Sequence, residues 1–213
     1  MSDSRAGVPR SPLARLPGEG GPGIGHNQGP PINEGHGLRR VAWRKARAAL
    51  LPRLPLEVLK RRVARAKRLG LAYPAYASIL AGTGRDVVAF LFTSHALGLR
   101  LARAHALPEA KAAKLREIGG AERLLLGPEG EDAAALAEAL ERERRVAFAG
   151  ARPAPPLAAP LPEGRQAVRA LLAPLKLPAD GVVMIGDRAE ERDWAEAARL
   201  GRFMAAGAYF EAR

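Results

Sequence analysis

The side chain best placed to do chemistry stands where an apolar run ends in glycine and aspartate. Val182–Ile185 is a short hydrophobic stretch, Gly186 and Asp187 follow it, and a helix-like segment comes a few residues later. Such a run predicts a buried strand, and open α/β sheets bind ligands at the carboxyl ends of their strands. Asp187 is therefore the first candidate, although its neighbours along the chain supply no evident partner.

Other reactive side chains are scarce in this sequence. Ser94 and His95 have the types of a nucleophile and a base, but neighbours at a strand end point in different directions and no acid is placed to orient the ring. His26 and His36 lie in a glycine-rich stretch and are expected to be unligated. The chain has no cysteine, which excludes disulfides, thiolate catalysis and cysteine-ligated zinc.

The net charge of +12 is concentrated in one short segment. Residues 38–70 carry twelve basic side chains against only Glu57, and therefore hold eleven of the twelve excess charges. Such a density predicts a polyanion as partner, because neutralising phosphates releases counterions and gives affinity without sequence information. The alternatives are a solvated helical face, or an arm that docks on an acidic protein or membrane surface.

The basic segment reads as two helices broken near Pro52 and Pro55. Four apolar residues of the second helix recur at helical spacing and predict a packing face, with basic residues around the rest. These four are Leu56, Leu59, Val63 and Ala66. A third helix over 75–81 would complete a helix-turn-helix, but Tyr76 and Ile79 stand where base-reading residues are expected. Contacts should therefore go mostly to the phosphate backbone.

From Asp86 onward, short apolar runs alternate with amphipathic segments. The expected strands are 87–92, 124–126, 146–149, 182–185 and 202–205. The expected helices are 99–118 with a break at Pro108, 132–145, 166–175 and 193–200. Strands separated by helices predict a Rossmann-like α/β fold with a parallel sheet. Residues 1–36 are rich in proline and glycine, which predicts a disordered tail.

Three features near the end of the chain carry a family resemblance. They are Ala159-Pro160-Leu161-Pro162-Glu163 before a helix, Leu177-Pro178-Ala179-Asp180, and the strand that ends at Gly186-Asp187. Together they resemble the last third of haloacid dehalogenase-like hydrolases. In that family the Gly-Asp carboxylate helps to hold magnesium. The resemblance thus implies a metal ligand at Asp187, with Glu191 or Asp193 as the second acid.

The sequence departs from that family where its chemistry would be done. The family's nucleophilic aspartate follows the first strand, where this chain has Thr93-Ser94-His95, and an aspartyl intermediate requires that carboxylate. The family's serine or threonine would fall at Ala149 or Gly150, and its lysine at Ala159. Three of the four expected groups are absent, which favours a protein without catalytic activity.

We therefore expect a cytoplasmic bacterial protein with a tail (1–36), a basic helical region (37–85) and a Rossmann-like domain (86–213). The leading hypothesis is a non-catalytic nucleic-acid-binding or regulatory protein without a cofactor. Its expected contacts with DNA or RNA phosphates are Arg44, Lys45, Lys60, Arg61, Arg62, Arg65 and Arg68. The alternatives are a magnesium-dependent phosphatase that uses Asp187 and Asp193, and a protein-assembly factor. No apolar run is long enough to span a bilayer.

Overall fold

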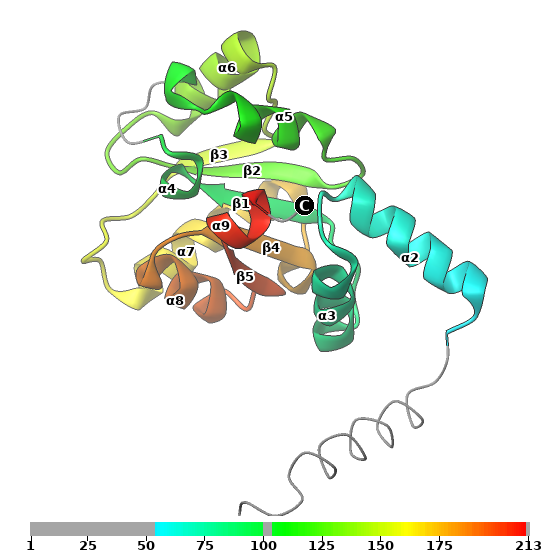
Figure 1. Ribbon diagram of the computed structural model, residues 1–213. Coiled ribbons are helices and arrows are strands. Elements are labelled where there is room, and N and C mark those ends of the chain that lie inside the picture. Colours follow the sequence, from blue (N-terminus) through cyan, green and yellow to red (C-terminus); the bar gives the residue numbers. More distant parts are fainter. Residues whose placement is uncertain (1–53, 100–103, 212–213) are drawn as a thin grey trace, which may run out of the picture. The chain divides into compact units, whose positions relative to one another are not determined.

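The computed structural model of this protein describes residues 54–99 and 104–211. Within them, five parallel strands form one sheet in the order β3-β2-β1-β4-β5 (Figure 1). The strands are β1 (Ala89–Thr93), β2 (Glu122–Gly127), β3 (Gly150–Pro153), β4 (Val182–Gly186) and β5 (Arg202–Ala205). The expected α/β fold with a parallel sheet is confirmed. The expected tail lies outside the described residues.

Helices connect the strands and cover both faces of the sheet. Before β1 come α2 (Leu56–Arg68) and α3 (Tyr73–Thr83). The later helices are α4 (Ser94–Leu97), α5 (Glu109–Glu117), α6 (Ala133–Arg144), α7 (Leu161–Leu172), α8 (Ala189–Ala197) and α9 (Ala206–Phe210). Short 3-10 turns occupy Ala104–Ala106, Ala173–Leu175 and Ala179–Gly181. Among the residues that the structure describes, none of the helices combines the length and apolar character that crossing a bilayer requires.

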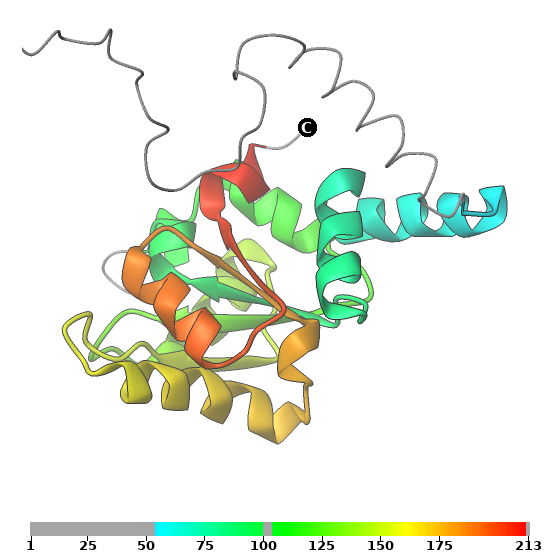
Figure 2. The ribbon, with the colours of Figure 1, turned by 90° about the horizontal axis from the view of Figure 1, so that it is seen from below.

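Two hydrophobic cores lie on opposite faces of the sheet, because successive side chains of a strand alternate in direction. In β1, Phe90 and Phe92 face a core shared with α2, α3, α5, α6 and α9. Ala89 and Leu91 face the other core, under α7 and α8. Figure 2 shows α7 and α9 on opposite sides of the strands. Burial on both faces explains why the central strands read as continuous apolar runs.

The third strand begins later than the sequence pattern predicts. The expected strand at 146–149 is wrong, and β3 instead covers Gly150–Pro153. Arg145 adopts a left-handed conformation with φ 54° at the end of α6. The Val146 amide then donates to the Leu140 carbonyl at 3.3 Å, which closes the helix end. Val146 is buried because it seals this helix terminus rather than because it lies in the sheet.

The expected helix over 99–118 is confirmed only from Glu109 onward: Leu99 is not helical, Ala104–Ala106 form a 3-10 turn, and 100–103 lie outside the described residues. Gly98 has φ 82° and ends α4, and the Leu99 amide donates to the Ser94 carbonyl at 2.8 Å. The regular helix α5 starts only after Pro108, which occupies its N-cap position. Gly98 and Pro108 therefore set the helix boundaries here, since Gly98 ends α4 and Pro108 immediately precedes α5.

The face of α2 that packs overlaps the predicted one only in part, since Ala66 is buried and Leu59 is half-buried as expected. Leu56 and Val63 are 63% and 45% exposed, although both belong to the expected packing face. Ala66 and Leu69 are buried, and Arg65 is half-buried on the same side. Only the C-terminal end of α2 lies against the rest of the fold, and its N-terminal end projects outward (Figure 1). Polar contacts of Arg65, described below, explain this rotation.

Helix α9 is anchored by Tyr209, which is buried between Phe90 and Phe92. Its hydroxyl donates to the Leu69 carbonyl at 3.2 Å. Burial raises the pKa of Tyr209 well above its ordinary value of 10.0. Folding therefore favours the protonated phenol, and this contribution is full below the unfolded pKa and is lost as the pH rises toward the folded pKa.

We expect Tyr209→Phe to change how stability depends on alkaline pH. At neutral pH the variant should lose about 1 kcal/mol, because it lacks the hydrogen bond to Leu69. Above about pH 10 the wild-type protein should lose stability with each pH increment, since its unfolded state releases the phenolic proton. The variant should decline less steeply over the same range. Urea unfolding at several pH values would measure this, and parallel curves for the two proteins would contradict it.

Candidate functional site

A pocket of about 460 Å³ opens at the carboxyl edge of the sheet. It is lined by the residues that follow β1, β2 and β4, with Ser94 and His95 from the first of these strands. Strand β1 has β2 and β3 on one side and β4 and β5 on the other. The chain thus reverses its winding direction at this point, which is where open α/β sheets form their binding crevices. The pocket opens at the edge of the sheet where β4 ends, but Asp187, the predicted site residue, is not among the residues that line it.

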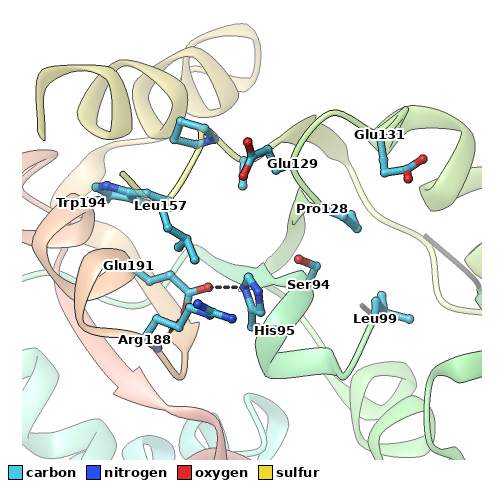
Figure 3. A pocket seen from close by; sticks show the side chains of 12 residues that line it. Ser94, His95, Leu99, Pro128, Glu129, Glu131, Leu157, Arg188, Glu191 and Trp194 are labelled. Atoms are coloured by element: carbon cyan, nitrogen blue, oxygen red, sulfur yellow. Dashed lines mark hydrogen bonds and ion pairs between the residues drawn. The ribbon is translucent and has the colours of Figure 1, made fainter. Parts of the chain in front are cut away.

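Glu191 is the buried polar centre of this pocket and is only 1% exposed. Its Oε2 accepts hydrogen bonds from the backbone amides of Asp187 at 2.8 Å and Arg188 at 3.1 Å. Its Oε1 lies 3.1 Å from Nδ1 of His95 (Figure 3). Gly186 makes room for this carboxylate, since a Cβ atom there would lie 2.6 Å from Glu191 Oε2. The absence of a side chain at Gly186 therefore leaves the space that the Glu191 carboxylate occupies.

His95 and Glu191 form a dyad that the sequence analysis missed. The expectation that no acid orients the histidine ring is wrong, because Glu191 contacts it. Ser94 and His95 both line this pocket, and within the described chain no hydrogen bond joins their side chains. Ser94 is the first residue of α4 rather than part of the strand. Dyad partners 96 positions apart leave no local signal that could have revealed them.

The dyad fixes the orientation of the imidazole. A carboxylate can only accept, so the His95 ring must donate from Nδ1 to Glu191. In the neutral ring this leaves Nε2 as an acceptor, and in the protonated ring Nε2 is a second donor; within the described chain it makes no hydrogen bond. The Ser94 hydroxyl likewise has no partner among the described residues, although Ser94 is buried. Two polar groups are thus left for a ligand in the pocket.

We predict that nitrogen NMR of the histidine ring will find His95 in the Nδ1–H tautomer. Glu191→Gln should shift His95 toward the usual Nε2–H form, because the amide is a weaker acceptor than the carboxylate. Glu190→Gln is the matched control, since that residue lies outside the pocket lining. Tautomer populations that are identical in the wild-type protein and in Glu191→Gln would refute the dyad.

Asp187 and Asp193, the two predicted metal ligands, lie in different surroundings. The Asp187 carboxylate accepts a hydrogen bond from the Ala206 amide at 3.1 Å and so supports the start of α9. Asp193 is exposed on α8, two residues after Glu191 and therefore about 200° around the helix from it. Within residues 54–99 and 104–211, no group of three or more His, Asp or Glu side chains could hold a metal ion. A magnesium site made of Asp187, a second carboxylate and a substrate phosphate stays a prediction.

The predicted phosphate contacts fall into different environments. Arg44 and Lys45 lie outside the described residues. Four basic residues of α2 are exposed to solvent, and one other, Arg62, is half-buried in a shallow groove beside Tyr76. The exposed four are Lys60, Arg61, Lys67 and Arg68. Among the described residues, only Lys60 of this group pairs with a carboxylate, that of Glu57 at 3.0 Å.

Arg65 has a structural part to play in addition to its charge. Its Nε donates to Asp86 Oδ2 at 2.8 Å, and its Nη2 donates to the carbonyls of Val87 at 2.8 Å and Gly120 at 3.1 Å. The guanidinium thereby ties α2 to the start of β1 and to the turn before β2. The proximity of Asp86 also raises the pKa of Tyr76, although burial of the phenol is the larger cause. Since its donors are occupied, Arg65 has less to offer a phosphate than its neighbours.

The chain was compared with known proteins. No family model matches it, and no curated protein matches it significantly.

Proposed function

We propose that this protein binds the phosphate backbone of a nucleic acid through α2, without catalysis. The observation that supports this most directly is the solvent face of α2, where four basic side chains stand on one projecting helix. Their only carboxylate partner within the described chain is Glu57. Charges arranged in this way are free to release counterions when phosphates approach.

The composition of α2 favours backbone contacts over base reading. The helix contains no aromatic residue that could stack on a base. It also lacks asparagine and glutamine, which recognise adenine edges. Helix α3 offers no recognition surface either, because its central residues Tyr76 and Ile79 are buried. Binding should therefore depend on charge and only weakly on sequence.

This proposal is tested by measuring how the affinity for nucleic acid depends on salt concentration. Fluorescence anisotropy with a labelled duplex DNA, and with the corresponding RNA, would give affinities between about 50 and 200 mM salt. We expect log K to fall linearly with log salt, with a slope of about −3 to −4 if four phosphates are neutralised. Affinity that ignores ionic strength would contradict the proposal. A stoichiometric protein partner captured without nucleic acid would favour the assembly-factor hypothesis instead.

A further inference from the structure

The pocket at the carboxyl edge of the sheet carries opposite charges on facing sides. Arg188 lines it from the loop between β4 and α8, next to the dyad of His95 and Glu191. Glu129 and Glu131 line it from the turn between β2 and α6 (Figure 3). The Glu191 carboxylate keeps its negative charge, but it is buried, and its oxygens face His95 and the backbone amides of Asp187 and Arg188 rather than the open pocket.

The turn that bears the two glutamates has a defined geometry. The Glu131 amide lies 3.5 Å from the Pro128 carbonyl, and Gly130 between them has φ 71°. This is a β-turn that requires the left-handed conformation glycine allows. It sets both carboxylates on the rim of the pocket, across from Arg188. The space between the two rims also holds the unbonded Ser94 hydroxyl and His95 Nε2.

We propose that this pocket binds a small zwitterion of the amino-acid type. The ligand's carboxylate lies against the Arg188 guanidinium, and its ammonium group lies toward Glu129 and Glu131. A ligand with a single charge finds an attractive partner on one rim only and meets its own sign on the other. The volume of about 460 Å³ is within the range of small-molecule pockets. Leu99 and Leu157 provide apolar surface for a side chain.

The test measures binding of the standard amino acids to the full chain by isothermal titration calorimetry. Propionate and propylamine serve as comparison ligands, because each keeps only one of the two charges of alanine. We expect at least one amino acid to bind about tenfold or more tightly than either single-charge ligand. Equal affinity for propionate, or no binding by any amino acid, would overturn the inference.

Two variants locate the binding in this pocket. Arg188→Gln and Glu129→Gln should each weaken the amino acid by about tenfold, because each removes a charged hydrogen-bond partner. Arg169→Gln and Glu196→Gln are matched controls, since both residues are exposed and outside the pocket lining. Both pocket residues are exposed, so the variants should fold, and circular dichroism checks this. Equal effects of pocket and control variants would place the site elsewhere and refute the proposal. Nucleic-acid binding through α2 is a separate property and can succeed or fail independently.

Discussion

Neutralising the solvent face of α2 is expected to lower affinity for duplex nucleic acid by about 100-fold or more near 0.1 M salt. The variant combines Lys60→Gln, Arg61→Gln, Lys67→Gln and Arg68→Gln. Each lost phosphate contact removes about 0.9 from the slope of log K against log salt. The slope should therefore become shallower by about 3 to 4, in step with the loss of affinity. Anisotropy titrations of both proteins at matched salt concentrations would measure both quantities.

A control with the same change in net charge separates local contact from general attraction. It carries glutamine in place of four exposed basic residues outside α2. These are Arg142, Arg165, Arg169 and Lys176. We expect the control to retain most of the affinity, since long-range attraction is screened beyond about 10 Å at 0.1 M salt. Equal losses in the two variants would show that binding follows net charge rather than α2, and would refute the assignment to this helix.

The alternation of elements was readable from the sequence because the central strands β1 and β4, and β2 from Leu124, are buried on both faces. Continuous apolar runs marked β1, β2 and β4, and turn signals such as Gly70 and Gly84 marked the ends of α2 and α3. The expected strand over 202–205 coincides with β5. The errors fell at Val146 and Leu99, where an apolar residue is buried for a reason other than regular secondary structure. The spacing of apolar residues indicates which residues are buried, but it does not show whether they lie in a helix, in a strand or in a turn that closes a helix end.

The sequence predicted where the site lies but not which residues meet there. The glycine and carboxylate at the end of β4 located the edge of the sheet where the pocket opens. The sequence could not show that Glu191 is the acid that contacts His95. Its burial depends on hydrogen bonds from backbone amides and from His95, which only the folded chain brings together. The sequence pattern therefore indicated Asp187 as the first candidate instead of Glu191, because Asp187 directly follows the strand. Pairs far apart in the chain are fixed by tertiary structure alone.

The orientation of α2 also depends on tertiary contacts that the sequence pattern does not show, in this case polar ones. Its aliphatic residues predicted one packing face, but Leu56 and Val63 are exposed. Arg65 makes polar contacts with Asp86, Val87 and Gly120 that no aliphatic contact replaces. An unpaired carbonyl or carboxylate near the interior is unfavourable. Satisfying these acceptors therefore outweighs the burial of two aliphatic side chains at the projecting end of the helix.

Arg65→Ala is accordingly expected to lower the free energy of unfolding by about 2 to 4 kcal/mol. The change removes one ion pair and the hydrogen bonds to the carbonyls of Val87, Gly119 and Gly120, and leaves the Asp86 carboxylate without this partner. Urea unfolding followed by circular dichroism would measure the loss. Arg61→Ala is the control on the same helix, because Arg61 is exposed and should change stability by less than about 0.5 kcal/mol.

Arg65→Lys distinguishes the geometry of the guanidinium from its charge. Lysine keeps the positive charge and can pair with Asp86, but a single ammonium cannot present the fork that also reaches Val87 and Gly120. We expect it to recover less than half of the stability lost in Arg65→Ala. Full recovery would mean that charge alone holds α2 in place. Stability unchanged by either substitution would mean that apolar contacts at Ala66 and Leu69 suffice, and the proposed cause of the helix rotation would be wrong.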